Sequence, residues 1–140
     1  MAETFPLQLV TPVGVAYEGD VEEVTAWNPI GQFGVLAEHI NYITSLVPGV
    51  VEIRLPGGAM RHYVVSGGLA EVKDGKMTIL ADSAEEPGNI DVSAVEIVIR
   101  ETEGKIAQIS MYAEEFETTQ HDLMLARARH RAATDLRASH

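Results

Sequence analysis

The first half of the chain alternates between apolar and polar residues in short segments. In residues 49–55, for example, Val51, Ile53 and Leu55 fall on one face of an extended strand. Glycine and proline interrupt this alternation about every 8 to 12 residues, a spacing typical of antiparallel sandwiches and barrels. We therefore expect a β-sandwich of about eight to ten short antiparallel strands. The segments concerned are 5–10, 13–17, 21–27, 33–36, 42–46, 49–55, 60–65, 69–72 and 77–80.

The pattern changes near residues 87–89. Beyond this point glycine occurs only once, at Gly104, and the apolar period lengthens to that of a helix. Asp91 is suitably placed to cap the start of a first helix, and Gly104 costs this helix about 1 kcal/mol relative to alanine. One apolar stripe runs along it, formed by Val95, Val98, Ile99, Thr102, Ile106 and Ile109.

A break near residues 111–113 precedes a second expected helix over residues 114–137. Its apolar side chains fall on two weak stripes instead of one strong stripe. The two helices should form an antiparallel hairpin. The sequence thus predicts two units, a β-sandwich over residues 1–88 and a helical hairpin over residues 89–140.

Charge is distributed unevenly between these units. The chain carries a formal net charge of -11, and residues 1–88 hold twelve Asp/Glu against four Lys/Arg. Such an acidic body argues against nucleic acid as a general partner. Residues 123–140 are basic, because they contain four arginines and a single acidic residue, Asp135. The arginines are Arg127, Arg129, Arg131 and Arg137. Two interpretations of these arginines remain open, ordinary surface charge and contact with an acidic partner.

Composition excludes several further classes. The chain has no cysteine, which rules out disulfides and thiolate chemistry. The first residues lack the basic start and apolar run of a secretion signal. No apolar run approaches the roughly 18 residues that a membrane-spanning helix needs. We therefore expect any connection with a membrane to pass through a partner.

Signals for catalysis are weak throughout the sequence. The glycine-rich segments 31–34 and 66–68 lack the Gly-Lys-Ser/Thr of a phosphate-binding loop, and we interpret them as turns. The histidines lack the spacing of a helical zinc motif. A cupin-like metal site using His39 and His62 stays open as an alternative, but we expect neither a catalytic residue nor a metal site.

Five short motifs nevertheless occur in a characteristic order and resemble the epsilon subunit family of F-type ATP synthases, whose mitochondrial members are called delta. They span almost the whole chain. The motifs are Gly31-x-x-Gly34-Val35-Leu36 followed by His39; Leu46-x-Pro48-Gly49-Val50; Ser66-Gly67-Gly68-Leu69-x-Glu71-Val72; Thr78-Ile79-Leu80-Ala81-Asp82-x-Ala84; and Ile90-Asp91.

The resemblance implies a non-catalytic subunit of the central stalk that joins the gamma subunit to the membrane-embedded ring of c subunits. The loop Ile30, Gly31 and Gln32 matches the family's contact with the ring, although many members carry an acidic residue at the position of Gln32. The positions near gamma are matched by His39, Ile43 and Thr44. The implied location is the cytoplasmic face of the bacterial inner membrane, as a peripheral protein.

The resemblance also implies a hairpin that moves from the sandwich into the catalytic head and suppresses ATP hydrolysis there. Arg127, Arg129 and Arg131 are then expected to meet acidic segments of the beta subunits. Members that bind ATP carry an arginine four residues after the isoleucine of Ile-Asp, where this chain has Ala94. We therefore expect weak or absent nucleotide binding at Ile90 and Asp91, and no cofactor.

One further alternative of a different class stays open. A free-standing β-sandwich that binds a carbohydrate or peptide ligand, with the hairpin as a dimerisation element, would share the same strands and helices. It predicts a small-molecule complex and no association with gamma.

Overall fold

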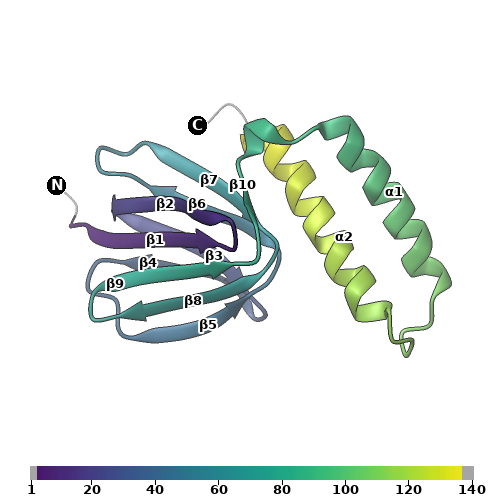
Figure 1. The fold of residues 1–140 in the computed structure, drawn as a ribbon, viewed down its shortest axis with the longest axis horizontal. Coiled ribbons are helices and arrows are strands. Elements are labelled where there is room, and N and C mark those ends of the chain that lie inside the picture. Colours follow the sequence, from purple (N-terminus) through teal and green to yellow (C-terminus); the bar gives the residue numbers. More distant parts are fainter. Residues whose placement is uncertain (1–2, 137–140) are drawn as a thin grey trace.

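The fold was analysed in a computed structural model, which describes residues 3–136. Within these residues, ten strands form two five-stranded sheets, and two helices follow them (Figure 1). The β-sandwich and the helical hairpin are therefore confirmed. The strands are β1 (Phe5–Thr11), β2 (Gly14–Val21), β3 (Glu23–Asn28), β4 (Gly31–Leu36), β5 (Tyr42–Leu46), β6 (Gly49–Arg54), β7 (Met60–Val65), β8 (Gly68–Lys73), β9 (Lys76–Ala81) and β10 (Ala84–Glu85).

The strand order is β2-β1-β9-β8-β5 in the first sheet, called sheet A, and β10-β7-β6-β3-β4 in the second, called sheet B. All strand pairs are antiparallel except one, since β1 runs parallel to β9 with Leu7 opposite Met77. The expectation of purely antiparallel pairing was wrong at this pair. The alternation of apolar and polar residues shows which face of a strand is buried. Because this pattern is the same in parallel and antiparallel strands, it could not predict the direction of this pair.

The core lies between the two sheets and consists of the inward positions of each strand. Leu7, Leu9, Ile53, Met77 and Ile79 are fully buried there. Each is separated from the next inward residue of its strand by one outward residue, as the alternation of the sequence predicts. The sandwich thereby leaves two outer faces, one on each sheet.

The helical hairpin begins after a short turn of 3-10 helix, η1 (Pro87–Asn89). Helix α1 (Val92–Gln108) is capped by Asp91, whose Oδ1 accepts a hydrogen bond from the Ala94 backbone N–H at 3.2 Å. Helix α2 (Phe116–Arg131) continues into one turn of π-helix, η2 (Ala132–Leu136).

Helix α2 starts two residues later than the predicted Glu114, and the predicted end at Arg137 lies outside the described residues. Its late start has a local cause. The Ser110 carbonyl accepts from Ala113 N–H and the Ala113 carbonyl accepts from Phe116 N–H, so the chain forms successive turns before the helix begins. Glu114 and Glu115 stand in this connection instead of in the first helical turn.

The hairpin docks on the outer face of sheet B through α2, which packs on β6 and β7, while α1 packs on α2 (Figure 1). Both weak stripes of α2 are used. Thr119, Leu123 and Ala126 from the first are buried, as is Ala132 from the second. The two stripes have different directions because α2 meets α1 on one side and the sandwich on another.

Candidate functional site

The outer face of sheet A carries apolar side chains that no described element covers. Leu69 on β8 lies directly opposite Leu80 on β9, and their inward neighbours Ala70 and Ile79 are buried. Ile43 on the edge strand β5 projects from the same face, opposite Glu71 of β8. Ile43 is 60% exposed and Leu80 is 51% exposed. We call Ile43, Leu69 and Leu80 the sheet A patch.

Such a patch is characteristic of a surface that meets another protein, because contiguous apolar residues on the surface of a soluble domain mark interaction sites. Sequence reasoning singled out Ile43 but missed Leu69 and Leu80. Both leucines belong to the quoted motifs, and both are apolar at outward positions of alternating strands. An apolar residue at an outward strand position, where alternation predicts a polar one, was the signal that could have identified them.

The three residues expected near gamma do not share one face. Thr44 is half-buried, and its hydroxyl donates to the Ser45 carbonyl at 3.2 Å. His39 lies in the turn after β4, with its Nδ1 2.7 Å from the Ile40 carbonyl and its ring centroid 5.9 Å from that of Tyr42. Ile43 is thus exposed on the outer face of sheet A, His39 is half-buried against Tyr42, and Thr44 faces the other way from Ile43.

The turn expected to contact the ring, Ile30 to Gln32, is held by a side chain that the sequence analysis did not identify. Oδ1 of Asn28 accepts hydrogen bonds from the backbone N–H of Ile30 at 2.9 Å and of Gly31 at 3.0 Å. Asn28 is 8% exposed, and its Nδ2 donates to the Tyr42 hydroxyl at 3.2 Å. This turn presents Ile30, which is 98% exposed. A short Asn side chain bonding to the backbone two residues on is a recognisable turn former.

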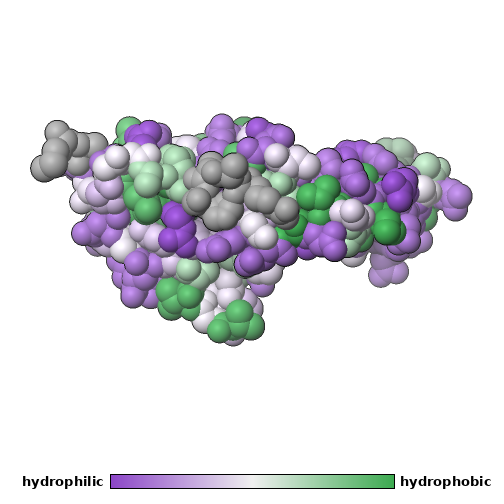
Figure 2. All heavy atoms as spheres, turned by 90° about the horizontal axis from the view of Figure 1, so that it is seen from above, coloured by the Kyte–Doolittle hydropathy of each residue, from purple (hydrophilic) through white to green (hydrophobic). Residues whose placement is uncertain are grey.

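A second exposed apolar tip lies at the same end of the sandwich. Val13, in the turn between β1 and β2, is 99% exposed. In sheet A, β1 and β5 run in the same direction and finish at the same end, where Val13 lies. Val47 N–H, just after β5, donates a hydrogen bond to the Trp27 carbonyl near the end of β3. The Ile30 turn, which follows β3, therefore lies at the same end as Val13. Seen from above, the surface is mostly hydrophilic, with separate hydrophobic patches over the sandwich and the hairpin (Figure 2).

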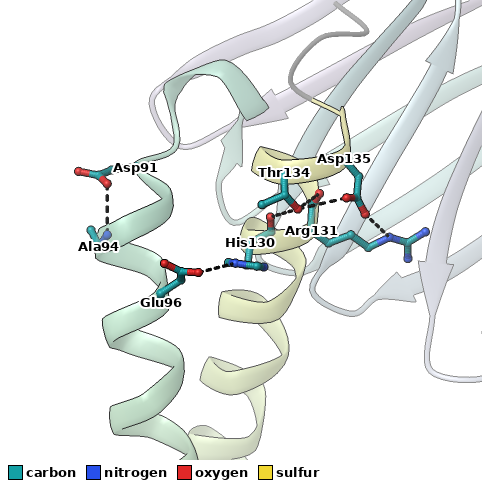
Figure 3. A network of polar contacts seen from close by, with 7 residues as sticks. All are labelled: Asp91, Ala94, Glu96, His130, Arg131, Thr134 and Asp135. Atoms are coloured by element: carbon teal, nitrogen blue, oxygen red, sulfur yellow. Dashed lines mark hydrogen bonds and ion pairs between the residues drawn. The ribbon is translucent and has the colours of Figure 1, made fainter.

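The three arginines expected to contact the beta subunits all have acidic partners within the chain. Arg127 Nη2 donates to Glu103 of α1 at 2.9 Å, which joins the two helices. Arg131 lies 4.0 Å from Asp135 (Figure 3). Arg129 forms a two-pronged contact with Glu85 of β10, at 2.9 and 3.0 Å. In the docked form these cations therefore lie against carboxylates of the same chain, two in the hairpin and one on the sandwich.

The residues named for nucleotide binding have structural roles here. Ile90 is 1% exposed and packs in the seam between the hairpin and the sandwich. Asp91 caps α1, and beside this cap His130 Nε2 lies 3.3 Å from a Glu96 oxygen of the facing helix (Figure 3). Ala94, at the position of the family's arginine, is exposed and apolar, so it offers no cation to a phosphate.

The metal-site alternative can be compared with the side chains of residues 3–136. No group of three His, Cys, Asp or Glu in this range is arranged to hold a metal ion, and His62 instead lies 3.8 Å from Glu52. The cupin-like alternative therefore lacks its ligand set in the described chain. Burial raises the pKa of the Tyr63 hydroxyl, while Arg61, which donates to it at 2.9 Å, acts in the opposite direction.

A groove of about 460 Å³ separates α2 from the turns at one end of sheet B. Its walls include Trp27 and Pro48 from the sandwich, and Met124, Ala128 and Arg131 from the hairpin. The groove exists only while the hairpin is docked, since one of its walls is α2. None of the described helices is long and apolar enough to cross a membrane.

Together these features define a class of protein, a small β-sandwich with an uncovered apolar face on one sheet and a helical hairpin docked on the other. Residues 4–87 match the family model described as the ATP synthase Delta/Epsilon chain, beta-sandwich domain. The chain belongs to the delta/epsilon family of ATP synthase subunits.

Relatives extend this match into the hairpin. A protein of Halalkalibacterium halodurans named ATP synthase epsilon chain is 34% identical over 128 residues, covering 91% of this chain and 94% of the relative. A protein of Clostridium botulinum (strain Alaska E43 / Type E3) with the same name is 34% identical over 115 residues, covering 82% of this chain and 86% of the relative.

Solved structures agree in fold. A chain of the Euglena gracilis mitochondrial ATP synthase, from a structure of OSCP, F1 and the c-ring, superposes with a TM-score of 0.82 at 26% identity, covering 92% of this chain and 81% of its own length. A chain from the central stalk and c-ring of the Tetrahymena thermophila mitochondrial enzyme gives a TM-score of 0.69 at 17% identity, covering 95% of this chain and 98% of the other. The second similarity concerns the fold alone.

Proposed function

We propose that this chain is a non-catalytic rotor subunit that couples the gamma subunit of an F-type ATP synthase to its ring of c subunits. The sheet A patch carries the proposal, because it is an apolar face that the chain's own described elements leave open. Family membership indicates the complex in which such a face has a partner. The subunit then acts mechanically, by transmitting torque, and its own side chains make or break no bond.

The two partners engage different regions of the sandwich. Gamma binds the sheet A patch together with the half-buried His39, which lies just before β5, the strand that carries Ile43. The c ring meets the turn of Ile30, Gly31 and Gln32. Support for this second contact comes from Asn28, which holds that turn in one shape, and from the exposure of Ile30. Binding to these partners would hold the subunit at the membrane surface, on the cytoplasmic face of a bacterial inner membrane.

The hairpin is proposed to act as a brake on ATP hydrolysis. When α2 leaves sheet B, Arg129 loses its Glu85 partner on the sandwich and becomes available to acidic segments of the catalytic head. Arg127 and Arg131 keep carboxylate partners within the hairpin, which those acidic segments must displace. Each exposed contact contributes about 1 kcal/mol or less, so several must act together. Nucleotide binding by the isolated subunit is expected to be weak or absent because Ala94 supplies no cation, and a micromolar affinity in calorimetry would contradict this.

A pull-down from membranes of the source cell tests the assignment. The tagged chain should recover gamma together with the alpha and beta subunits. Replacing Ile43, Leu69 and Leu80 by serine should abolish recovery of gamma, because the apolar contact area is lost while the inward core residues are unchanged. A matched control replaces Ile97 and Val98, exposed apolar residues of α1, by serine. Equal recovery by the patch variant and the control would contradict the proposed contact, and a bound carbohydrate or peptide without gamma would favour the free-standing module.

A further inference from the structure

The hairpin is attached to the sandwich through a small apolar seam. Its buried members are Val64 of β7, Ile90, Val95 of α1, and Ala132 and Ala133 of η2. Six half-buried apolar residues pack against them, namely Val50, Val92, Ile99, Leu125, Ala128 and Leu136. Two of the buried members are alanines, which bury little area each, and α1 packs mainly on α2. Burial in the seam contributes about 25 cal/mol for each Å² of apolar area.

One ion pair supplements this seam. Arg129 Nε donates to one oxygen of Glu85 at 2.9 Å, and its Nη2 donates to the other at 3.0 Å. This is the parallel two-bond geometry in which guanidinium and carboxylate groups interact most strongly. The side chains are 30% and 33% exposed, so solvent screens the pair only in part. The neighbouring ion pairs of α2, Arg127 with Glu103 and Arg131 with Asp135, stay within the hairpin.

The position of Glu85 is as informative as its contact. Glu85 is the last residue of β10, a two-residue edge strand in which it pairs with Val64. The chain then runs through η1 to Asp91 and enters α1. Any departure of the hairpin must turn about this connection. The carboxylate is thus fixed on the sandwich beside the point of rotation, and the guanidinium is fixed on the element that would move.

We propose that Glu85 and Arg129 form a latch that holds the hairpin docked and, at the same time, withholds Arg129 from any other acidic partner. The second half rests on the proposed braking function, in which Arg129 meets the catalytic head. Glu85 and the head then compete for a single guanidinium. Losing Glu85 should release an intact arginine, whereas losing Arg129 should release a hairpin that has lost one of its contacts.

The chain contains a natural reporter for docking. Trp27 is its only tryptophan, and it lines the groove whose opposite wall includes Met124 and Ala128 of α2. Departure of the hairpin removes that wall and opens Trp27 to a soluble quencher. Backbone amides of α2 supply a second and more sensitive readout, since their hydrogen exchange follows even a small population of the released form.

The first experiment uses the isolated full chain. Glu85→Gln and Arg129→Gln should each increase acrylamide quenching of Trp27 and speed exchange of α2 amides by about fivefold, the upper range for a partly exposed ion pair. Exchanging the charges, with Glu85→Arg and Arg129→Glu together, should restore slow exchange. Glu103→Gln is the matched control, because its partner Arg127 lies within the hairpin. Parental exchange rates in both single variants would overturn the latch.

The second experiment measures ATP hydrolysis by enzyme assembled with the same variants. Glu85→Gln should lower the rate, and Arg129→Gln should lower it less or not at all. Faster exchange in the isolated chain without this difference in the assembled enzyme would support the latch and contradict the braking function. The two parts of the account therefore fail separately.

Discussion

Single polar side chains fix the turns on which the candidate surfaces depend. Asn28 is the clearest case, because one oxygen satisfies the N–H groups of Ile30 and Gly31 while its amide nitrogen reaches Tyr42. Removing a buried acceptor that serves two backbone donors lowers the stability of the fold, because both N–H groups then bond only to water or remain without an acceptor. The shape of the turn that presents Ile30 is therefore set from beneath by a residue that contacts no partner.

Replacing Asn28 by alanine should lower the free energy of unfolding by about 1 to 2 kcal/mol. Urea unfolding measures the change. Asn28→Asp is the matched control, because it keeps the acceptor oxygen and can receive a hydrogen bond from the Tyr42 hydroxyl, so its loss should be smaller. Equal losses in the two variants would show that the turn does not depend on the acceptor.

Tyr63 makes stability depend on alkaline pH. Burial raises its pKa in the folded state, against the opposing effect of Arg61. The unfolded chain then loses the phenolic proton first, near pH 10, so the stability contributed by neutral Tyr63 is complete below that pH and is lost as pH rises further. Tyr63→Phe should flatten this decline in urea unfolding between about pH 9 and 11. A decline as steep as that of the parent would assign the effect to other groups.

At the scale of elements, the strands were predictable and the packing of the hairpin was not. Tyr42–Leu46 and Met60–Val65 match their expected bounds, although residues 62–65 are all buried, because the core covers Tyr63 and Val65 and the hairpin seam covers Val64. β10 was missed because two residues are too few to show a period. The partners of Arg127 and Arg129 were also beyond reach, since sequence periodicity carries no information on contacts between separate elements. Leu69 and Leu80 could have been found from their outward positions.

Helix α1 carries a conspicuous weakness at Gly104, where an added methyl group would meet nothing within 4 Å. Gly104→Ala should therefore stabilise the helix by about 1 kcal/mol without steric cost. The thermal transition of the helical circular dichroism signal is expected to move upward. Ala107→Gly, at another exposed position of α1, should move it downward. A lower transition for Gly104→Ala would indicate that this glycine has a role in packing or bending.

Helix α2 is the element on which the braking function depends. Replacing Arg127, Arg129 and Arg131 together by alanine should raise ATP hydrolysis of the assembled enzyme, because the released helix would have lost its contacts of about 1 kcal/mol or less each. Arg100→Ala serves as a control cation on α1. Unchanged inhibition in the triple variant would count decisively against these arginines as the contact.

At the scale of the whole molecule, the two sheets have different surroundings. The hairpin packs on β6 and β7 at one end of sheet B, whereas the sheet A patch stays open (Figure 1). The exposed tips at Val13 and Ile30 stand at one end of the sandwich. A body with an apolar side and a shaped end suits a part that joins two rotor components, and the groove between α2 and the turn of Ile30 places the hairpin beside that end.

The most direct measurement of this coupling is ATP-driven proton pumping by synthase particles stripped of their own epsilon subunit and supplied with this chain. The parent chain should restore pumping. A variant with Ile43, Leu69 and Leu80 replaced by serine, and with parental unfolding free energy, should not restore it. Full restoration by that variant would contradict the claim that the sheet A patch joins the subunit to the rotor.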